Sequence, residues 1–255
     1  MATRREKLFG TVKRYIKEPK AFFRETYGAF RQILKILRPM QKDYRERLDM
    51  RLSDWLLYHQ RNIVFDKCHW MGVRALKNPL DAWIYQEVIH DAQPDVIIEI
   101  GSWEGGSTLY FANLLDILGK GIVISIDIDR SIYNVKHNRI ITITGSSSSE
   151  EVLARVVELC RGKAVLVVHD GNHHKEQVLQ DLRNYSNLVS VNSYFIVEDG
   201  IVDLFKPGDG MGQLYEGPLK AVEQFVSENS NFVVDRERER YILTYNPKGF
   251  LRRIR

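Results

Sequence analysis

The stretch that decides the fold is Asp95-Val-Ile-Ile-Glu-Ile-Gly-Ser-Trp-Glu-Gly-Gly-Ser107. An apolar run ends in the carboxylate of Glu99, and Gly101 then opens a turn with two further glycines before Ser107. This order predicts a buried parallel strand, a tight glycine loop and the start of a helix. Glycines at such a place let the backbone approach a ligand closely at the carboxyl end of a strand.

The spacing of this loop indicates what kind of ligand it would bind. It reads E-x-G-x-x-x-G rather than the G-x-G-x-x-G that packs a pyrophosphate against a helix N-terminus. The carboxylate of Glu99 would repel a phosphate, but it suits a cationic ligand such as the ammonium and sulfonium groups of S-adenosylmethionine. An ordinary strand–turn–helix corner is the alternative interpretation.

Two further strands are expected after this loop. The apolar run Gly121–Asp127 ends in an acid, and an acid at that place in a βαβ unit characteristically accepts hydrogen bonds from ribose hydroxyls. The next run, Arg139–Thr144, leads into Gly145-Ser-Ser-Ser-Ser149. Because a helical pattern follows almost at once, we interpret this segment as a short loop over the adenine edge rather than as a linker.

Composition places the chain among globular proteins. Its 255 residues, 44% hydrophobic and 27% charged, fit one large α/β domain with an appendage. The two cysteines, Cys68 and Cys160, form no disulfide framework and no zinc-ligand spacing. No apolar run is long enough to span a membrane, and the N-terminus lacks the apolar region of a secretory signal, so we expect a cytoplasmic protein.

Charge is distributed unevenly along the chain. Residues 1–50 hold 14 basic and 6 acidic groups, a net charge of +8, whereas the other residues hold 23 basic and 27 acidic groups, a net charge of −4. The main domain therefore shows no basic footprint, and we expect no nucleic-acid partner.

The first 60 residues predict a basic helical extension, separate from a main domain over residues 61–255. An apolar stripe recurs at three- and four-residue steps, and its members are Phe23, Tyr27, Phe30, Leu34 and Leu37. The stripe is expected to pack on the protein itself or on a sister subunit, which would make the protein a homo-oligomer. The basic face of residues 1–45 could alternatively contact an anionic membrane.

The main domain predicts an α/β fold. A helix capped near Asn78 with Pro79 in its first turn leads into an alternation of strands and helices. We expect the strands to end at Ile100, Asp127, Thr144, His169 and Glu198. Short β-type runs then follow at Phe232–Asp235, Tyr241–Tyr245 and Gly249–Ile254. The expected fold is a doubly wound, mostly parallel seven-stranded sheet with a C-terminal antiparallel hairpin.

Three acids end two neighbouring strands. Asp170 follows one apolar run, and Glu198 and Asp199 follow the next. If they meet at the carboxyl edge, two like charges about 4 Å apart cost roughly 4 kcal/mol at an effective dielectric near 20. Such a cluster requires protonation or a cation, and all-oxygen ligands favour Mg²⁺ or Ca²⁺, with Mn²⁺ also suitable. Solvated turn residues are the alternative.

Three histidines lie around these acids. His173 follows Asp170 closely and could act as a general base on a substrate hydroxyl, because its ordinary pKa lies near the working pH. The alternative is that no side chain acts as a base. We expect His174 to be a solvated residue at a helix start and His169 to be a packed strand residue facing away from Asp170.

Eight segments together resemble the cephalosporin hydroxylase family and its relatives, the rhamnosyl O-methyltransferases. These segments are Trp70–Gly72, Lys77–Glu87, Glu99–Ser107, Ile124–Arg130, Asp170–His173, Val197–Asp199, Asp235–Glu239 and Asn246–Leu251. The resemblance implies a class I, S-adenosylmethionine-dependent and Mg²⁺-assisted methyltransferase with a Rossmann-like fold. It implies cofactor contacts at Glu99, Gly101, Gly105, Asp127 and Gly145, Ser146 and Ser147, to which we add Ser102 and Ser107. It implies metal ligation by Asp170, Glu198 and Asp199.

Two features qualify this resemblance. Related metal-dependent sugar methyltransferases read Asp-x-Asp-His after the strand, whereas this chain has Asn172, which cannot take a proton. Activation of the hydroxyl therefore passes to His173, to the metal alone, or to no group. The "hydroxylase" label also needs caution, because we find no two-histidine–carboxylate triad for iron.

The expected function is O-methylation of a hydroxyl next to a second oxygen, in a sugar of a glycan, glycolipid or glycosylated natural product. One alternative is a methyltransferase of small catechol-like substrates. Another is a cofactor-binding partner subunit without catalysis. The Gly-rich segment 206–218 is expected to form a lid whose Met211, Leu214 and Tyr215 face the acceptor.

Overall fold

The computed structural model describes residues 43–206, 212, 213 and 215–255. Its contacts divide the chain into Met1–Asn62 and Ile63–Arg255, and each unit is described by itself. The apolar stripe of residues 23–37 and nearly all of the segment 1–45 lie outside the described residues. Among the residues described, no helix combines the length and apolar character that crossing a membrane requires.

The described part of the first unit is helical. Helix α3, Tyr44–Leu48, begins after Asp43, whose side chain accepts a hydrogen bond from the Glu46 N–H. Helix α4, Leu52–His59, carries the Trp55 ring stacked on His59 with centroids 4.4 Å apart. A π-helical turn, η1 (Gln60–Val64), and the short α5 (Phe65–Lys67) follow along the chain.

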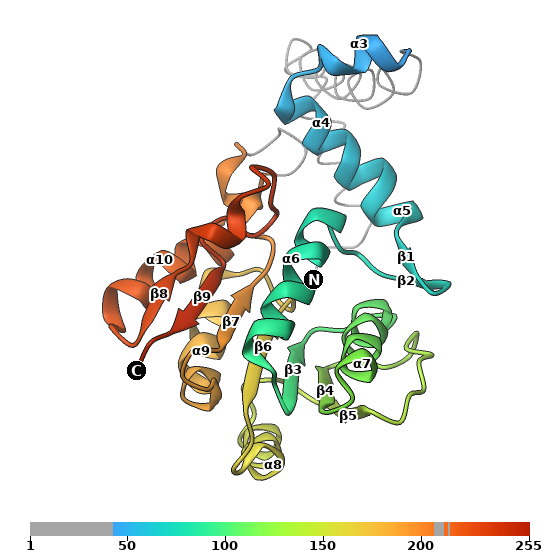
Figure 1. Ribbon diagram of the computed structural model, residues 1–255. Coiled ribbons are helices and arrows are strands. Elements are labelled where there is room, and N and C mark those ends of the chain that lie inside the picture. Colours follow the sequence, from blue (N-terminus) through green and yellow to red (C-terminus); the bar gives the residue numbers. More distant parts are fainter. Residues whose placement is uncertain (1–42, 207–211, 214) are drawn as a thin grey trace, which may run out of the picture. The chain divides into compact units, whose positions relative to one another are not determined.

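The second unit is built on a seven-stranded sheet with the strand order β5-β4-β3-β6-β7-β9-β8 (Figure 1). The strands are β3 (Val96–Ile100), β4 (Ile122–Asp127), β5 (Ile140–Thr144), β6 (Val165–His169), β7 (Tyr194–Val197), β8 (Phe232–Val234) and β9 (Phe250–Arg253). The first five run parallel, and β9 is antiparallel to both β7 and β8. This arrangement confirms the predicted doubly wound sheet with its antiparallel C-terminal hairpin. A small hairpin, β1 (His69–Trp70) with β2 (Val73–Arg74), was not predicted.

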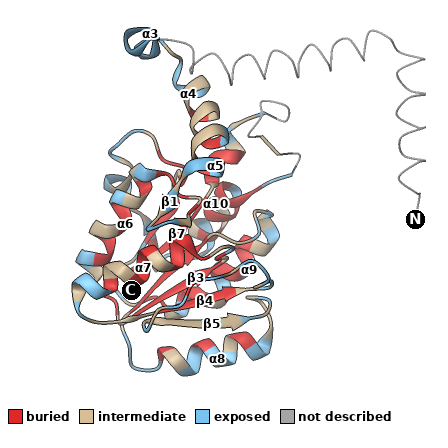
Figure 2. Ribbon diagram, turned by 90° about the vertical axis from the view of Figure 1, so that its right-hand side faces the viewer, coloured by how far each residue is buried: buried red, intermediate tan, exposed pale blue. Residues whose placement is uncertain are grey.

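Helices cover both faces of the sheet. Helices α6 (Pro79–Ala92) and α7 (Gly106–Leu118) pack on one face, and α8 (Glu150–Cys160), α9 (Lys175–Tyr185) and α10 (Pro218–Glu228) pack on the other. Three short 3₁₀ turns, η2 (Ser186–Leu188), η3 (Gly200–Leu204) and η4 (Arg236–Glu239), complete the unit. Figure 2 shows the central strands buried between these layers.

Alternation along the strands decides which side chains face the α6/α7 layer. Ile97, Val168 and Ile196 belong to the core under α6 and α7, whereas their strand neighbours belong to the opposite core. Because successive side chains point to opposite faces, Glu99 shares the face of Ile97. Continued past the strand ends, the same alternation places Asp170 and Glu198 on that face too.

The predicted β-type run Tyr241–Tyr245 is not a strand. Ile242 has a positive φ of 68°, and the Leu243 N–H donates to the Tyr241 carbonyl at 2.7 Å. The Thr244 hydroxyl and the Tyr245 N–H donate to the Asp81 carboxylate at 2.6 and 2.8 Å. These polar groups are therefore bound by a side chain of α6 instead of a neighbouring strand.

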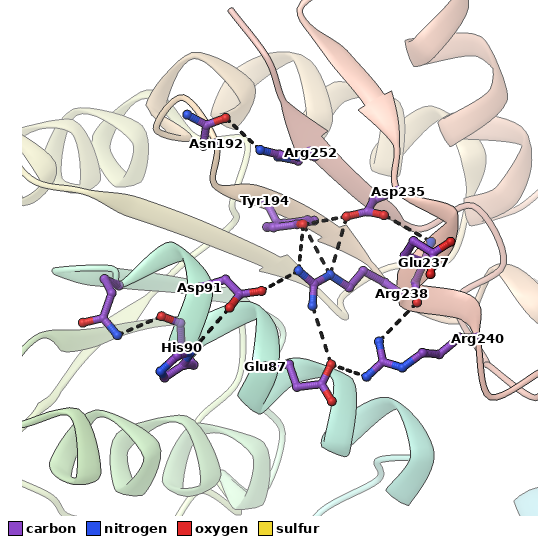
Figure 3. A network of polar contacts seen from close by, with 11 residues as sticks. Glu87, His90, Asp91, Asn192, Tyr194, Asp235, Glu237, Arg238, Arg240 and Arg252 are labelled. Carbon is purple, nitrogen blue, oxygen red and sulfur yellow. Dashed lines mark hydrogen bonds and ion pairs between the residues drawn. The ribbon is translucent and has the colours of Figure 1, made fainter.

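A network of charges joins the C-terminal segment to α6 (Figure 3). We call it the surface network, and its members are Glu87, Asp91, Tyr194, Asp235, Arg238 and Arg240. Arg238 lies at its centre, 2.7 Å from Asp91 and 3.6 Å from Glu87. The Tyr194 hydroxyl donates to Asp235 at 2.6 Å and so links β7 to the same network.

Candidate active site

A cavity of about 500 Å³ lies at the carboxyl ends of the strands. Its size is in the range of small-molecule sites, and its place matches where ligands bind in open α/β sheets. Of the residues predicted to contact a cofactor, those that line it are Gly101, Ser102, Asp127, Gly145, Ser146 and Ser147. Asp170 and Asn172 line it as well.

The glycines of the loop between β3 and α7 are required by close packing. Gly101 has a φ of +84°, and a Cβ there would lie 2.2 Å from the Asp170 carbonyl oxygen. Gly105 has a φ of +92°, and a Cβ there would lie 2.6 Å from the Tyr133 ring. The absence of a side chain therefore lets Gly101 lie against the end of β6 and Gly105 against Tyr133.

Asp127, at the end of β4, binds the same loop. Its Oδ2 accepts from the backbone N–H groups of Ser102 and Trp103, both at 2.9 Å, and its Oδ1 accepts from the Asp129 N–H at 3.1 Å. Burial works to raise the pKa of Asp127, but the N–H groups of Ser102 and Trp103 outweigh it and hold the pKa below its ordinary value. An ionised carboxylate thus lies at the cavity wall.

Glu99 lies beneath the loop rather than at the cavity. It is fully buried, and its two oxygens accept hydrogen bonds from the hydroxyls of Ser107 and Thr108 at the start of α7. Burial raises the pKa of Glu99 to about 7. Ser107 lines a smaller neighbouring cavity, and Gly105 lines neither of the two. Cofactor contact stays a prediction at these three positions and at those that line the larger cavity.

Asp181 of α9 lines the cavity and is the centre of a buried polar cluster. The Ser147 hydroxyl lies 2.9 and 3.0 Å from the two oxygens of Asp181, which is 1% exposed. The Nε2 atom of His169 lies 3.1 Å from the same carboxylate. His169 is therefore a packed strand residue on the face away from Asp170, as predicted. The roles of Asp181 and of the neighbouring Gln177, which also lines the cavity, were not predicted.

The acids at the ends of β6 and β7 meet around a lysine that the sequence analysis missed. The Lys77 ammonium contacts Asp170 Oδ2 and lies 2.7 Å from Glu198 Oε2, and its side chain is only 6% exposed. Burial alone would lower the pKa of Lys77, but the carboxylates of Asp170 and Glu198 raise it well above its ordinary value. Lys77 therefore carries its charge in the interior.

His173 contacts oxygens of these acids that Lys77 does not contact. His173 Nε2 lies 3.4 Å from Asp199 Oδ2 and 3.8 Å from Asp170 Oδ1. One ligand atom from each of these three residues fits within 4.8 Å. Glu198 Oε1 is buried without a hydrogen-bond partner in the described part of the chain. Carboxylate oxygens with an unsatisfied buried acceptor among them fit a hard divalent cation.

The charge balance of this cluster was the signal that could have revealed Lys77. Three acids on neighbouring strand ends need compensation, and Lys77 stands in the segment just before α6, which packs on their face of the sheet. Asn78 caps this helix by accepting from the Leu80 N–H at 3.2 Å, and Pro79 is its first residue, as predicted.

The residues after Asp170 take different positions. His173 is half-buried, and although burial opposes it, Asp170 and Asp199 raise its pKa. The Asn172 side chain accepts from the His174 N–H at 2.8 Å. His174 is exposed at the start of α9, as predicted, and it stacks on Tyr215 with ring centroids 3.7 Å apart. Of the other predicted lid residues, Met211 and Leu214 lie outside the described residues.

Comparisons with known proteins agree on one family. Residues 62–254 match the family of rhamnosyl O-methyltransferase/CmcI. The chain is 29% identical to the rhamnosyl O-methyltransferase of Mycobacterium tuberculosis over 202 residues, which are 76% of this chain and 81% of the relative. The Mycobacterium leprae rhamnosyl O-methyltransferase is also 29% identical, over 76% of this chain and 86% of its own length.

Solved structures agree on the fold. A CmcI structure with Mg-SAM superimposes with a TM-score of 0.58 at 22% identity, over 87% of this chain and 96% of its own. A CmcI structure with SAH gives a TM-score of 0.53 at 22% identity, over 80% of this chain and 92% of its own. Both support a class I methyltransferase fold for the second unit.

Proposed function

Because the chain belongs to the rhamnosyl O-methyltransferase/CmcI family, we propose that it is an S-adenosylmethionine-dependent O-methyltransferase that uses Mg²⁺ and methylates a sugar hydroxyl. The observation that carries this proposal is the meeting of two features at one sheet edge. A cavity of cofactor size lies at the carboxyl ends of the strands. It is adjoined through Asp170 by a group of potential cation ligands, Asp170, His173 and Asp199, with the buried Glu198 beside them.

S-adenosylmethionine would occupy the cavity of about 500 Å³. Asp127 would accept hydrogen bonds from the ribose hydroxyls, while Gly101 and Ser102 offer backbone groups at close approach. Gly145, Ser146 and Ser147 would lie along the adenine. Glu99 would act from below, by holding the start of α7 through Ser107 and Thr108.

Mg²⁺ would be held by Asp170, Glu198 and Asp199. Asp170 and Asp199 already place one oxygen each within 4.8 Å of one another and of a His173 ring nitrogen. A divalent ion held by these residues would supply Lewis-acid chemistry that lowers the pKa of an acceptor hydroxyl. The chain's own residues would hold the acceptor next to the cofactor, so that positioning supplies much of the rate.

His173 is the candidate for removing the hydroxyl proton at its Nε2 atom. Asp170 and Asp199 would first have to be engaged by the cation, because in their present contacts they raise the pKa of His173 and favour its protonated form. Asn172, which lines the cavity and cannot accept a proton, leaves His173 and metal-assisted ionisation as the two routes.

The acceptor class is supported by the family but not by any residue identity in the cavity. A sugar of a glycan, glycolipid or glycosylated natural product is the proposed acceptor. A small catechol-like acceptor is the alternative, because adjacent oxygens would bind the same ion. Asn172 stands where related sugar methyltransferases have a second aspartate. This difference favours a third candidate function, a cofactor-binding subunit without catalysis.

The test is methyl transfer from labelled S-adenosylmethionine to a panel of rhamnosides, other glycosides and catechols. We expect label to enter a glycoside, to be lost in EDTA and to return with Mg²⁺. Transfer to catechols alone would overturn the sugar assignment, and full activity in EDTA would overturn the metal. Cofactor binding without transfer to any acceptor would favour the partner subunit.

For residues 1–45 we propose assembly or surface docking rather than methyl transfer, since this segment carries an apolar stripe and a strong positive charge. Deletion of residues 1–45 should leave S-adenosylmethionine binding intact and change either the oligomeric state on gel filtration or the binding to anionic liposomes. Membrane contact, if that is the role, should weaken steeply with salt. A truncated protein unchanged in both respects would contradict the proposal.

A further inference from the structure

We propose that the Lys77 ammonium is a permanent cation of the acid cluster, which consists of Asp170, Glu198 and Asp199. The ammonium balances the charge of Asp170 and Glu198, and it weakens the binding of Mg²⁺ to the same cluster. This inference deepens the proposed metal site and rests on it. It concerns a residue that neither the motif analysis nor the match to the family assigns.

The geometry divides the oxygens of two carboxylates. Lys77 Nζ contacts Asp170 Oδ2 and Glu198 Oε2. Asp170 Oδ1 instead faces His173, and Glu198 Oε1 is buried without a partner in the described part of the chain. Each carboxylate therefore gives one oxygen to the lysine and keeps the other for a different cation.

The main chain fixes the lysine in this place. The Lys77 N–H donates to the Ala75 carbonyl at 2.9 Å, and the Cys68 thiol donates to the Lys77 carbonyl at 3.3 Å. The next residue, Asn78, caps α6 and donates to the buried Asp81 at 2.9 Å. The backbone of Lys77 is thus fixed by hydrogen bonds, so its side chain begins inside the protein and not at the surface.

Charge balance explains why the site needs such a group. Asp170, Glu198 and Asp199 bring three acidic groups together in a buried place, and the Lys77 ammonium offsets part of the negative charge that they carry when ionised. Without Lys77 the acids would repel one another in the metal-free protein, and they would attract a divalent ion more strongly. Lys77 and the ion therefore bind the same carboxylates, and each weakens the binding of the other.

The experiment compares the wild type with Lys77→Met, which keeps a similar length and removes the charge. Thermal unfolding in EDTA should show a fall in melting temperature of about 10 °C for the variant. Saturating Mg²⁺ should recover much of this loss. Calorimetric titration with MgCl₂ alone should give a dissociation constant at least about tenfold lower for Lys77→Met than for the wild type.

A matched control is Lys220→Met, which breaks an exposed pair with Glu223 at 2.7 Å. It should change neither the melting temperature in EDTA nor the affinity for Mg²⁺. If Lys77→Met does not fold, the double variant Lys77→Met with Glu198→Gln carries the test, because it removes one charge of each sign. We expect it to fold in EDTA.

The outcomes separate the two proposals. Weaker or unchanged Mg²⁺ binding by Lys77→Met, with the wild type binding Mg²⁺, would overturn the role of Lys77 and leave the metal site intact. A wild type that shows no Mg²⁺ binding by calorimetry would overturn the metal site and this inference with it. A double variant that fails to fold would show that Lys77 acts by packing and not by charge.

Discussion

The buried acid cluster and the surface network use the same arrangement of charges in opposite surroundings. In each, one basic side chain joins carboxylates from two different segments of the chain. Lys77 and Glu198 are each 6% exposed in their side chains, whereas Asp91 in the surface network is 53% exposed. Arg238 is itself 14% exposed and pairs with exposed Asp91, whereas the ion pairs of Lys77 are with carboxylates removed from solvent.

The difference in exposure indicates that the surface network attaches one segment to another, whereas the buried cluster is a candidate for chemistry. Exposed ion pairs contribute about 0–1 kcal/mol each, so the surface network helps to hold η4 against α6 and can change at little cost. Charges taken out of water cost several kcal/mol unless they are paired, so a buried cluster persists only where it is closely compensated. Strongly perturbed groups beside a cavity are therefore candidates for function, whereas paired surface charges are not.

The largest expected effect comes from Asp170→Asn in the buried cluster. The change removes a charge that both the proposed ion and Lys77 need, and several kcal/mol of lost stabilisation correspond to a fall in methyl transfer of about a thousandfold. Binding of S-adenosylmethionine, measured by calorimetry, should stay largely intact. The matched change Asp91→Asn in the surface network should leave activity unaltered. Equal effects of the two variants would remove the distinction between the regions.

Glu99→Gln tests a buried acid whose hydrogen-bond partners are hydroxyls instead of a cation. The folded-state pKa of about 7 exceeds the ordinary value of 4.5, so the folded protein binds the proton more tightly than the unfolded chain. Wild-type stability should therefore be fully present below about pH 4.5 and fall as the pH rises toward and through 7. Glu99→Gln lacks this loss, and its advantage in urea unfolding should grow to about 3 kcal/mol at pH 9. A pH-independent difference would contradict the raised pKa of Glu99.

Asp127→Asn concerns a half-buried acid held by backbone N–H groups. Removing the charge weakens the proposed hydrogen bonds to ribose, and we expect the affinity for S-adenosylmethionine to fall about tenfold. Asp129→Asn, two residues further on, is the control and should bind as the wild type does. If Asp127→Asn retained full affinity, the cofactor would have to be held elsewhere.

Arg238→Met should have the smallest effect, although it removes the centre of a larger group of charges. We expect a loss of about 1 kcal/mol in the free energy of unfolding, which should shrink in high salt because exposed pairs are screened. Activity should be unchanged. A loss as large as that of Lys77→Met would show that the surface network carries more of the stability than its exposure indicates.

The sequence predicted most of the fold because the decisive patterns are local. The apolar runs and the glycine loop placed the ends of four strands at Ile100, Asp127, Thr144 and His169, where the structure has them, and the fifth within one residue. The Asn78-Pro79 helix start is likewise a local signal. The exception, Tyr241–Tyr245, failed because its polar groups bind Asp81, more than 150 positions earlier in the chain.

The site was less predictable because it depends on contacts between distant segments. An acid that follows an apolar run is recognisable in the sequence, so Asp127, Asp170 and Glu198 could be predicted as site residues. Nothing local distinguishes Lys77 from a solvated lysine, since its environment is created by strands 93 and 121 positions away. Glu99 shares its face of the sheet with Asp170, but it lies inside β3 and is bound by α7, whereas Asp170 lies beyond the end of β6 and reaches the cavity.

The position of β9 has a consequence for synthesis of the protein. This strand, Phe250–Arg253, is hydrogen-bonded to β7 on one side and β8 on the other, although it is translated after both. Until the ribosome has released it, β7 presents an open edge and β8 has no partner in the sheet. Nascent chains on neighbouring ribosomes could pair through such edges. The hydrophobic layer over β7 therefore has to remain protected, by a chaperone or by rapid helix docking, until Phe250 arrives.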